Sequence, residues 1–232
     1  MNIVINGGTR GIGKELVLFL SQDESNNIFV TGRNNKILQQ LSEKAEHKNI
    51  FTFRYDISVF EKLEKQFIET LSGCFKSVDI LINNAGTIIK KDFIDFSRDE
   101  ARRIIDTNFL GPAALIRAIK PLLVRGSHIV NISSMGGFQG STKYRGLSYY
   151  SASKAALSCL SECLAEEFRE EGIIVNCLAP GSVQTEMFEE AFPGHKAPVT
   201  AREMAELIIW FAVKGSKFFN GKVIPVALND PK

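Results

Sequence analysis

Tyr150 and Lys154 are spaced so that they could act together as an acid and a base. They lie four positions apart, and on a helix this spacing places both side chains on one face. A free tyrosine has a pKa of about 10 and exchanges protons poorly at neutral pH. A neighbouring ammonium stabilises the phenolate and lowers that pKa. Chance pairs with this spacing are common on helix surfaces, so the pair needs a supporting context; Tyr149, five positions from Lys154, is expected to serve in packing.

A glycine cluster follows the first apolar run and is a candidate phosphate-binding turn. Glycines allow a tight turn and let the backbone approach a pyrophosphate, and a helix after the turn presents unpaired N–H groups and a positive dipole end. The spacing is G-x-x-x-G-x-G rather than G-x-G-x-x-G, but the order of strand, glycine turn and helix favours a dinucleotide site over a plain turn. The candidate contacts are Gly7, Thr9, Arg10, Gly11, Ile12 and Gly13.

The residues about twenty positions after the turn predict the type of cofactor. An acidic residue there accepts hydrogen bonds from the adenine ribose of NAD, whereas an arginine suits the 2′-phosphate of NADP. Arg33 stands twenty positions beyond Gly13, and residues 28–36 contain no Asp or Glu. Arg10 is a second candidate, because two guanidinium groups can make charge-assisted contacts with one phosphate. We therefore expect NADP(H) in preference to NAD(H), the alternative being that both arginines are solvated surface residues.

Elements that could position these residues alternate along the whole chain. Strands that alternate with helices indicate βαβ units, and continuous apolar runs indicate strands that are buried on both faces. No repeat, low-complexity tract or linker interrupts the pattern, so residues 1–232 are predicted to form a single α/β domain, a doubly wound parallel sheet with helices on both faces. The predicted strands are residues 3–5, 28–31, 50–53, 78–82, 128–132, 173–178 and 222–226.

A long helix predicted before residue 123 has a defined start and an interruption. Ser97 and Glu100 form an S-x-x-E capping box at its start. Pro112 lacks the N–H group that would bond the carbonyl of Asn108. We therefore expect the Asn108 carbonyl to be free within the helix and to need another partner.

Composition and charge exclude several classes of protein. The chain has 28 basic and 26 acidic residues, and this near-balance argues against a general nucleic-acid binder. The sequence contains no run of about 18 apolar residues, which a membrane span would need, and the N-terminus does not resemble a signal peptide. The four cysteines form no CxxC pair and the three histidines are scattered, so we expect reduced thiols, no metal site and a cytoplasmic location.

Taken together, these residues resemble the short-chain dehydrogenase/reductase family over nearly the whole chain. Each part alone is weak, but all of them occur in the order that the family shows, which is specific. The matching parts are the glycine turn, Asp56-Ile57 after the third strand, Asn83-Asn84-Ala85-Gly86 after the fourth, Asn108, Ser133-Ser134 after the fifth, Tyr150 with Lys154, and Pro180-Gly181 with Val183 and Thr185 after the sixth.

The resemblance implies a Rossmann-type fold and a set of cofactor contacts. Asp56 and Ile57 would contact the adenine. Asn83, Ala85 and Gly86 would form the turn that passes beside the cofactor. The segment that closes over the nicotinamide would contain Pro180, Gly181, Val183 and Thr185.

The same resemblance implies the catalytic groups. Ser134 would hold the substrate oxygen, and Tyr150 would donate the proton. Lys154 would tune Tyr150 and bind the nicotinamide ribose, and the main chain of Asn108 would hold a water of the proton relay. The expected activity is hydride transfer from NADPH to a carbonyl carbon, or the reverse reaction on an alcohol.

The chain departs from the usual pattern of the family at three places. Asn6 replaces the threonine that usually precedes the first glycine. Sixteen positions separate Ser134 from Tyr150, a few more than usual; this leaves Ser133 open as an alternative and makes the loop 136–147 a candidate lid over the substrate. The segment 226–230 lacks the usual Asp-Gly-Gly ending.

The segment 182–200 is expected to cover the substrate. Met187, Phe188 and Phe192 favour a partly apolar substrate, and the acidic residues at 186, 189 and 190 argue against a strongly anionic one. A 3-oxoacyl thioester on an acyl-carrier protein, a small ketone, a sugar and a polyol stay open.

The expected partners are a small carbonyl or alcohol substrate and further copies of the chain, as a homodimer or homotetramer. The apolar segment 203–213 would lie against the sheet or at a subunit interface. No feature indicates nucleic acid or membrane. The alternative from another class is a regulatory protein that senses the cofactor without catalysis, although family members of that kind typically lose the tyrosine or the lysine.

Overall fold

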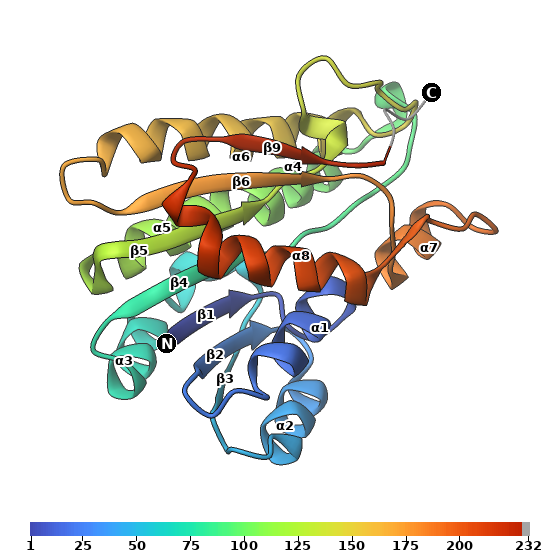
Figure 1. The fold of residues 1–232 in the computed structure, drawn as a ribbon. Coiled ribbons are helices and arrows are strands. Elements are labelled where there is room, and N and C mark those ends of the chain that lie inside the picture. Colours follow the sequence, from blue (N-terminus) through green and yellow to red (C-terminus); the bar gives the residue numbers. More distant parts are fainter. Residues whose placement is uncertain (229–232) are drawn as a thin grey trace.

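The seven predicted strands pair into one parallel sheet in the computed structural model, which describes residues 1–228 (Figure 1). The strand order is β3-β2-β1-β4-β5-β6-β9. The bounds are β1 (Asn2–Asn6), β2 (Asn27–Gly32), β3 (Ile50–Arg54), β4 (Val78–Asn83), β5 (Leu123–Ile132), β6 (Ile174–Pro180) and β9 (Val223–Val226). All seven predicted strands are confirmed, although β5 begins five residues earlier than its apolar run.

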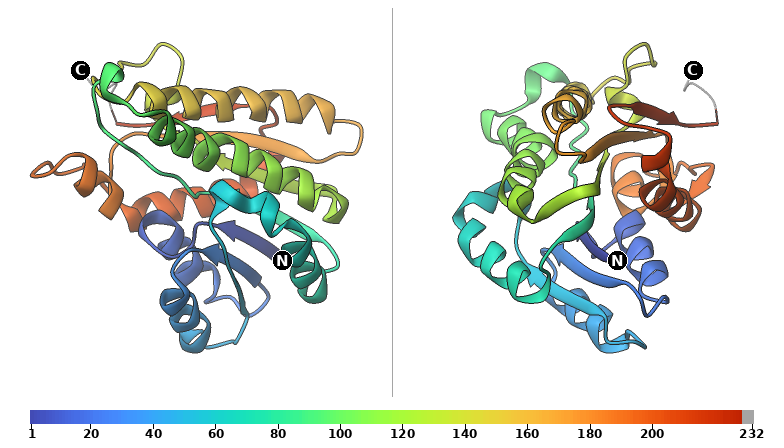
Figure 2. Two further views of the ribbon diagram at one scale, coloured as in Figure 1. Left: turned by 180° about the vertical axis from the view of Figure 1, so that it is seen from behind. Right: turned by 60° about the vertical axis from the view of Figure 1, so that its left-hand side comes forward.

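Helices cover both faces of the sheet, as predicted (Figure 2). One face carries α1 (Gly11–Leu20), α2 (Asn35–Lys44) and α8 (Ala201–Lys214). The other carries α3 (Glu64–Cys74), α4 (Arg98–Ile105), α5 (Gly111–Ile119) and α6 (Ser148–Glu167). Successive strand residues alternate between the two cores, so that Ile3 and Ile5 pack under α1 and α8 while Val4 packs on the side of α3 and α5.

The strand order reverses between β1 and β4, which places the ends of these two strands beside each other. In open α/β sheets, ligands bind in the crevice outside the carboxyl ends of the strands at such a switch point. The glycine turn follows β1, and the segment Asn84–Gly86 follows β4, with the N–H groups of Asn84 and Ala85 both donating to the carbonyl of Asn6. The fold therefore brings the two segments of the candidate site together.

The helix that starts at Ser97 is interrupted by a π-helical turn, η3 (Asp106–Leu110). Its predicted capping box is present, with hydrogen bonds in both directions between Ser97 and Glu100. The N–H of Gly111 bonds the carbonyl of Asp106, five residues back, and Pro112 then falls in the first turn of α5. A proline is tolerated there because the first N–H groups of a helix need no helical partner. The predicted interruption is confirmed, and the free carbonyl of Asn108 stays a prediction.

A short two-stranded element and α7 stand beside the carboxyl edge of the sheet. β7 (Val183–Gln184) pairs with β8 (Val199–Thr200), and α7 (Glu186–Ala191) lies between them in the chain. Two-residue strands are too short to show a periodicity, so the sequence did not predict them. Together they hold the segment expected to cover the substrate close to the ends of β1 and β6 (Figure 1).

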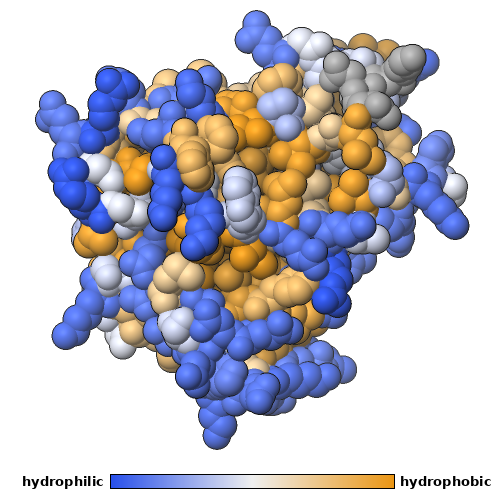
Figure 3. All heavy atoms as spheres, viewed as in Figure 1, coloured by the Kyte–Doolittle hydropathy of each residue, from blue (hydrophilic) through white to orange (hydrophobic). Residues whose placement is uncertain are grey.

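The apolar segment 203–213 lies within α8, packed against the sheet. Met204, Ile208 and Phe211 are buried, whereas Trp210 points outward and is 55% exposed. Apolar side chains gather on the face of the molecule that carries α8 (Figure 3). Among residues 1–228, no helix is both long and apolar enough to cross a membrane. Positions 229 and 230 of the unusual C-terminal segment lie outside the described residues.

Candidate active site

Tyr150 and Lys154 both line one cavity at the carboxyl edge of the sheet, near the start of α6. The side chain of Lys154 is 4% exposed and lies beneath the floor of the cavity, where its Nζ donates to the carbonyl of Ile132 at 2.8 Å. Gly86 faces the same ammonium, since a Cβ on that glycine would lie 3.4 Å from Nζ. The predicted pair is therefore close to the glycine-rich segment after β4.

The two candidate serines have different surroundings. The hydroxyl of Ser133 is buried and donates to the carbonyl of Lys154 at 2.8 Å. The hydroxyl of Ser134 accepts from the N–H of Gly136, and a Cβ on Gly136 would lie 3.6 Å from this hydroxyl and 3.7 Å from the ring of Tyr150. Ser134 is thus the serine whose hydroxyl lies beside the phenol, and Ser133 fixes the backbone of α6.

The expected effect of Lys154 on Tyr150 is wrong for this structure. Burial raises the pKa of Tyr150 above its ordinary value, and only the nearby hydroxyl of Ser134 opposes this. Burial also lowers the pKa of Lys154 to about 8. The physical reason is that the ammonium is turned toward the Ile132 carbonyl, and the low polarity around both groups disfavours charge on each of them. Tyr150 therefore keeps its proton at neutral pH.

The glycines let the turn pack against neighbouring backbone where side chains would clash. Gly7 has φ +89°, and a Cβ there would lie 2.6 Å from the Cα of Ala85. A Cβ on Gly13 would lie 2.0 Å from the carbonyl oxygen of Gly7. The N-cap of α1, Arg10, provides no side-chain hydrogen bond, whereas Asn34, Ser97 and Thr200 cap α2, α4 and α8. The first N–H groups of α1 can therefore bind a phosphate, and a dinucleotide fits this turn.

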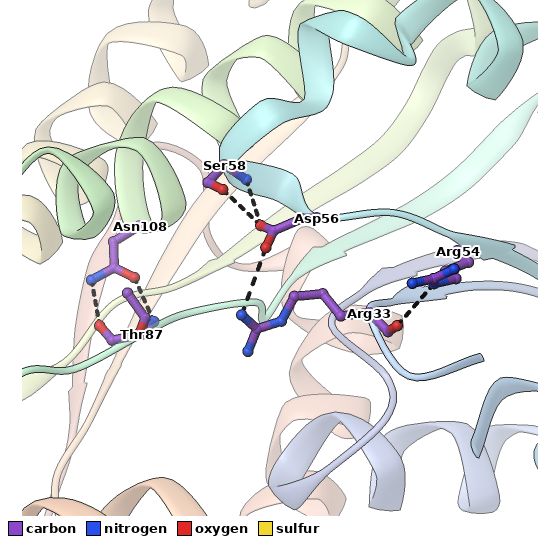
Figure 4. Close-up of polar contacts among 6 residues, drawn as sticks. All are labelled: Arg33, Arg54, Asp56, Ser58, Thr87 and Asn108. Carbon is purple, nitrogen blue, oxygen red and sulfur yellow. Dashed lines mark hydrogen bonds and ion pairs between the residues drawn. The ribbon is translucent and has the colours of Figure 1, made fainter. Parts of the chain in front are cut away.

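The two arginines proposed to bind a phosphate are paired with different carboxylates. Arg33 forms an ion pair with Asp56 at 3.6 Å and is about half exposed (Figure 4). The carboxylate of Asp56 also accepts from the N–H and hydroxyl of Ser58, and although burial opposes them, these hydrogen bonds and Arg33 hold its pKa below the ordinary value. Arg10 instead pairs with Glu190 of α7 at 3.0 Å. Arg54 supports Arg33 by donating to its carbonyl.

Asn83 does not line the cavity, contrary to expectation. Its amide is 1% exposed and bonds the side chains of Asn6 and Asn131 on the neighbouring strands, at 3.3 and 2.9 Å. The next residue, Asn84, lines the cavity and donates to the carbonyl of Gly7 at 2.9 Å. Because successive side chains point to opposite faces of a sheet, Asn83 at the end of β4 and its successor Asn84 point in different directions. That alternation could have identified Asn84 from the sequence.

The side chain of Asn108 acts as a clamp between three segments. Its amide oxygen accepts from the N–H of Thr87 at 2.8 Å, and its nitrogen donates to the carbonyl of Thr87 (Figure 4). The same nitrogen also donates to the hydroxyl of Ser153. The π turn is thereby tied to the segment after β4 and to α6. Ile57 is 5% exposed and packs in the core, and its contact with an adenine stays a prediction.

Most of the predicted residues meet at the cavity, and the others lie around it. Those that line it are Arg10, Gly11, Ile12, Ala85, Gly86, Ser134, Tyr150, Lys154, Pro180, Gly181, Val183 and Thr185. Those outside the lining are Gly7, Thr9 and Gly13 in the turn, Arg33, Asp56 and Ile57 toward β2 and β3, and Asn83 and Asn108. Tyr144 and Leu147, which also line it, are residues that the sequence did not single out.

Comparisons with known proteins show what the chain as a whole is similar to. The family model described as short chain dehydrogenase matches residues 1–196. An uncharacterized oxidoreductase of Staphylococcus epidermidis is 29% identical over 213 residues, which cover 89% of this chain and 88% of that protein. A solved dehydrogenase/reductase from Sinorhizobium meliloti 1021 has a TM-score of 0.84 and 26% identity over 97% of this chain and 92% of its own. The structure titled ElxO with NADP bound has a TM-score of 0.82 and 25% identity, covering 97% and 96%.

Proposed function

Since this chain belongs to the short-chain dehydrogenase family, we propose that it is an NADP(H)-dependent oxidoreductase that reduces a carbonyl group and, in reverse, oxidises the alcohol. The single observation that carries the proposal is that Ser134, Tyr150 and Lys154 line one cavity together with the start of α1. Hydroxyl donors and a nucleotide-binding turn share one space, as hydride transfer to a carbonyl requires.

The residues around the cavity would hold the cofactor and polarise the substrate. The glycine turn, Lys154 and the segment 180–185 would bind NADPH, which supplies a hydride when bound. The hydroxyls of Ser134 and Tyr150 would donate to the carbonyl oxygen of the substrate, where negative charge develops. Tyr150 would then pass its proton to that oxygen, because its raised pKa keeps the phenol protonated at neutral pH.

The test of this function is the substitution Tyr150→Phe. Removing a positioned proton donor should lower kcat by roughly 100- to 10,000-fold without loss of NADPH binding. Tyr149→Phe is the matched control, because Tyr149 is the neighbouring tyrosine and stacks on Phe93 instead of lining the cavity. NADPH oxidation with a panel of carbonyl compounds measures both variants. Near-normal turnover by Tyr150→Phe would refute the mechanism.

The preference for NADP(H) over NAD(H) is supported by Arg33 and Arg10. The exposed guanidinium of Arg33 is held by Asp56 beside the carboxyl end of β2, and residues 28–36 contain no acidic side chain that would repel a 2′-phosphate. We expect Arg33→Ala to raise the dissociation constant for NADPH by about tenfold, with little change for NADH, since one charge-assisted contact contributes about 1.5 kcal/mol. Fluorescence titration measures this, with Arg98→Ala of the exposed start of α4 as control.

Two further expectations are parts of the same proposal. The exposed Leu207 and Trp210 on α8 support assembly as a homodimer or homotetramer. A cytoplasmic location stays a prediction of the sequence.

A 3-oxoacyl thioester is the alternative substrate, and turnover of a soluble acetoacetyl thioester in the same panel tests it. A protein that binds NADPH but reduces nothing, with or without Tyr150, would instead fit the cofactor-sensing alternative.

A further inference from the structure

One end of the cavity is built from aromatic and aliphatic side chains of two separate segments. The loop 136–147 contributes Tyr144 and Leu147, and the segment around α7 contributes Met187, Phe188 and Phe192. The rings of Phe188 and Phe192 have centroids 5.2 Å apart, and Phe192 lies edge-on to Tyr144 at 6.5 Å. Phe192 thus joins the two segments through ring contacts.

Each of the three charged residues of the lining has a contact outside the five residues of this end. Lys154 is turned to the carbonyl of Ile132, and Arg10 is paired with Glu190. The carboxylate of Glu186 lies at the glycine turn, where a Cβ on Gly11 would be 3.4 Å from its Oε2. Lys90 lies over the ring of Phe192 at 4.5 Å, but it is exposed and does not line the cavity.

The chemistry of this end selects against charged and polyhydroxylated substrates. The five lining residues of this end, Tyr144, Leu147, Met187, Phe188 and Phe192, carry no positive charge, and burying an unpaired carboxylate or phosphate among them is strongly unfavourable. The hydroxyls of a sugar would find the phenol of Tyr144 and few other partners. A flat apolar group, in contrast, would exchange water for stacking and edge contacts with three rings.

We propose that the substrate is a neutral ketone or aldehyde with an aromatic ring near the carbonyl, and that Phe192 determines this preference. The inference rests on the proposed function, because it assigns the substrate class of that same site. It narrows the range left open by the sequence, since a sugar, a polyol and an anionic acid fall outside it.

A set of related probes tests the substrate class directly. The probes are acetophenone, its charged analogue 4-acetylbenzoate, the sugar xylose, and acetone as a reference too small to reach the rings. We expect kcat/KM for acetophenone to exceed the values for 4-acetylbenzoate and xylose by about tenfold or more. Calorimetric titration of acetophenone into the protein gives a second readout that does not depend on turnover.

Variants of Phe192 test the residue. Phe192→Ala should lower kcat/KM for acetophenone by about 10- to 100-fold and leave acetone within about threefold, so that the ratio between the two substrates falls. Phe192→Leu keeps apolar volume without a ring and should give an intermediate ratio. Phe218→Ala is the matched control, because this phenylalanine is 70% exposed and does not line the cavity.

Each outcome separates this inference from the proposed function. A preference for 4-acetylbenzoate or xylose, or an unchanged ratio in Phe192→Ala, overturns the inference while the oxidoreductase activity stands. If no probe oxidises NADPH but acetophenone binds the protein and binds Phe192→Ala more weakly, the proposed function fails and the aromatic site stands. If acetophenone neither binds nor reacts, the aromatic site is refuted.

Discussion

Lys154 carries its charge in a place where water cannot stabilise it. Its side chain is buried, its ammonium has the Ile132 carbonyl as a hydrogen-bond partner, and burial lowers its pKa to about 8. A lysine at this pKa is charged at neutral pH and loses its charge only slightly above it. This single residue therefore links the affinity of the site for an anionic cofactor to pH.

We predict that kcat/KM for NADPH falls as the pH rises through about 8. This ratio reports groups of the free enzyme, and above that pH the free enzyme loses the positive charge of Lys154. The decline should approach about tenfold per pH unit if the charge is required. Lys154→Arg should move the decline to higher pH, because a guanidinium stays protonated. The same decline in Lys154→Arg would assign it to another group; Lys76→Arg, an exposed substitution, is the control.

For single residues, the sequence predicts which of them form the candidate site but not the direction in which their side chains point. The spacing of Tyr150 and Lys154 placed both on α6 at the cavity, as expected. It could not show that the ammonium bonds the Ile132 carbonyl, since that contact depends on how β5 packs beneath α6. The sequence also could not decide between Ser133 and Ser134, because adjacent residues after a strand point in different directions.

An ion pair joins α7 to the glycine turn. Arg10, which is expected to bind a phosphate, is paired with Glu190 of α7 at 3.0 Å, and both side chains are partly exposed. The carboxylate thus occupies a partner that the cofactor would use. We therefore expect binding of NADPH at Arg10 to be coupled to displacement of this ion pair.

We predict that Glu190→Gln binds NADPH more tightly than the unaltered protein. An exposed ion pair contributes about 0.2–1 kcal/mol, so the dissociation constant should fall by between about 1.4- and 5-fold, and less at high salt. Glu189→Gln is a close control, since that carboxylate bonds Gln184 and not Arg10. Fluorescence titration at low and high ionic strength measures the effect. Weaker binding by Glu190→Gln would show that the carboxylate assists the cofactor site.

The long elements follow from the sequence, whereas the short ones near the site do not. Apolar runs predicted all seven strands of the sheet, and the capping box at Ser97 predicted the start of α4. The π turn at 106–110 was visible only as an interruption by Pro112, because the sequence does not show which hydrogen bonds replace the missing one. β7 and β8 depend on tertiary pairing, which no local pattern encodes.

Across the whole molecule, a row of polar side chains holds the ends of the strands in register beneath the site. Thr31 donates to Asn6, Asn6 to Asn83, Asn83 to Asn131, and Asn131 to Ser161 on α6. The first four are register partners on β2, β1, β4 and β5. The row explains why Asn83 serves the sheet instead of the cofactor, and it could not be predicted before the strand order was known.

A second buried polar group joins three elements on the other side of the sheet. His128 of β5 lies 2.9 Å from the carbonyl of Ala212 in α8 and 3.0 Å from the amide of Asn176 on β6. Burial lowers its pKa to about 4, against the hydrogen bond to Ala212, so the ring is neutral in the folded protein. The unfolded chain binds a proton there below about pH 6.5.

We predict that the free energy of unfolding decreases by about 3 kcal/mol as the pH falls from about 6.5 to about 4, because only the unfolded chain gains the proton in this window. Above about pH 6.5, the neutral ring of His128 makes its full contribution to the free energy of unfolding. Carboxyl groups with lowered pKa, such as Glu100 at about 2, act mainly at lower pH, so urea unfolding between pH 5 and 7 isolates the histidine. His128→Gln should flatten this slope whatever its own stability, and the exposed His47→Gln should keep it. A slope that persists in His128→Gln would assign the pH dependence to other groups.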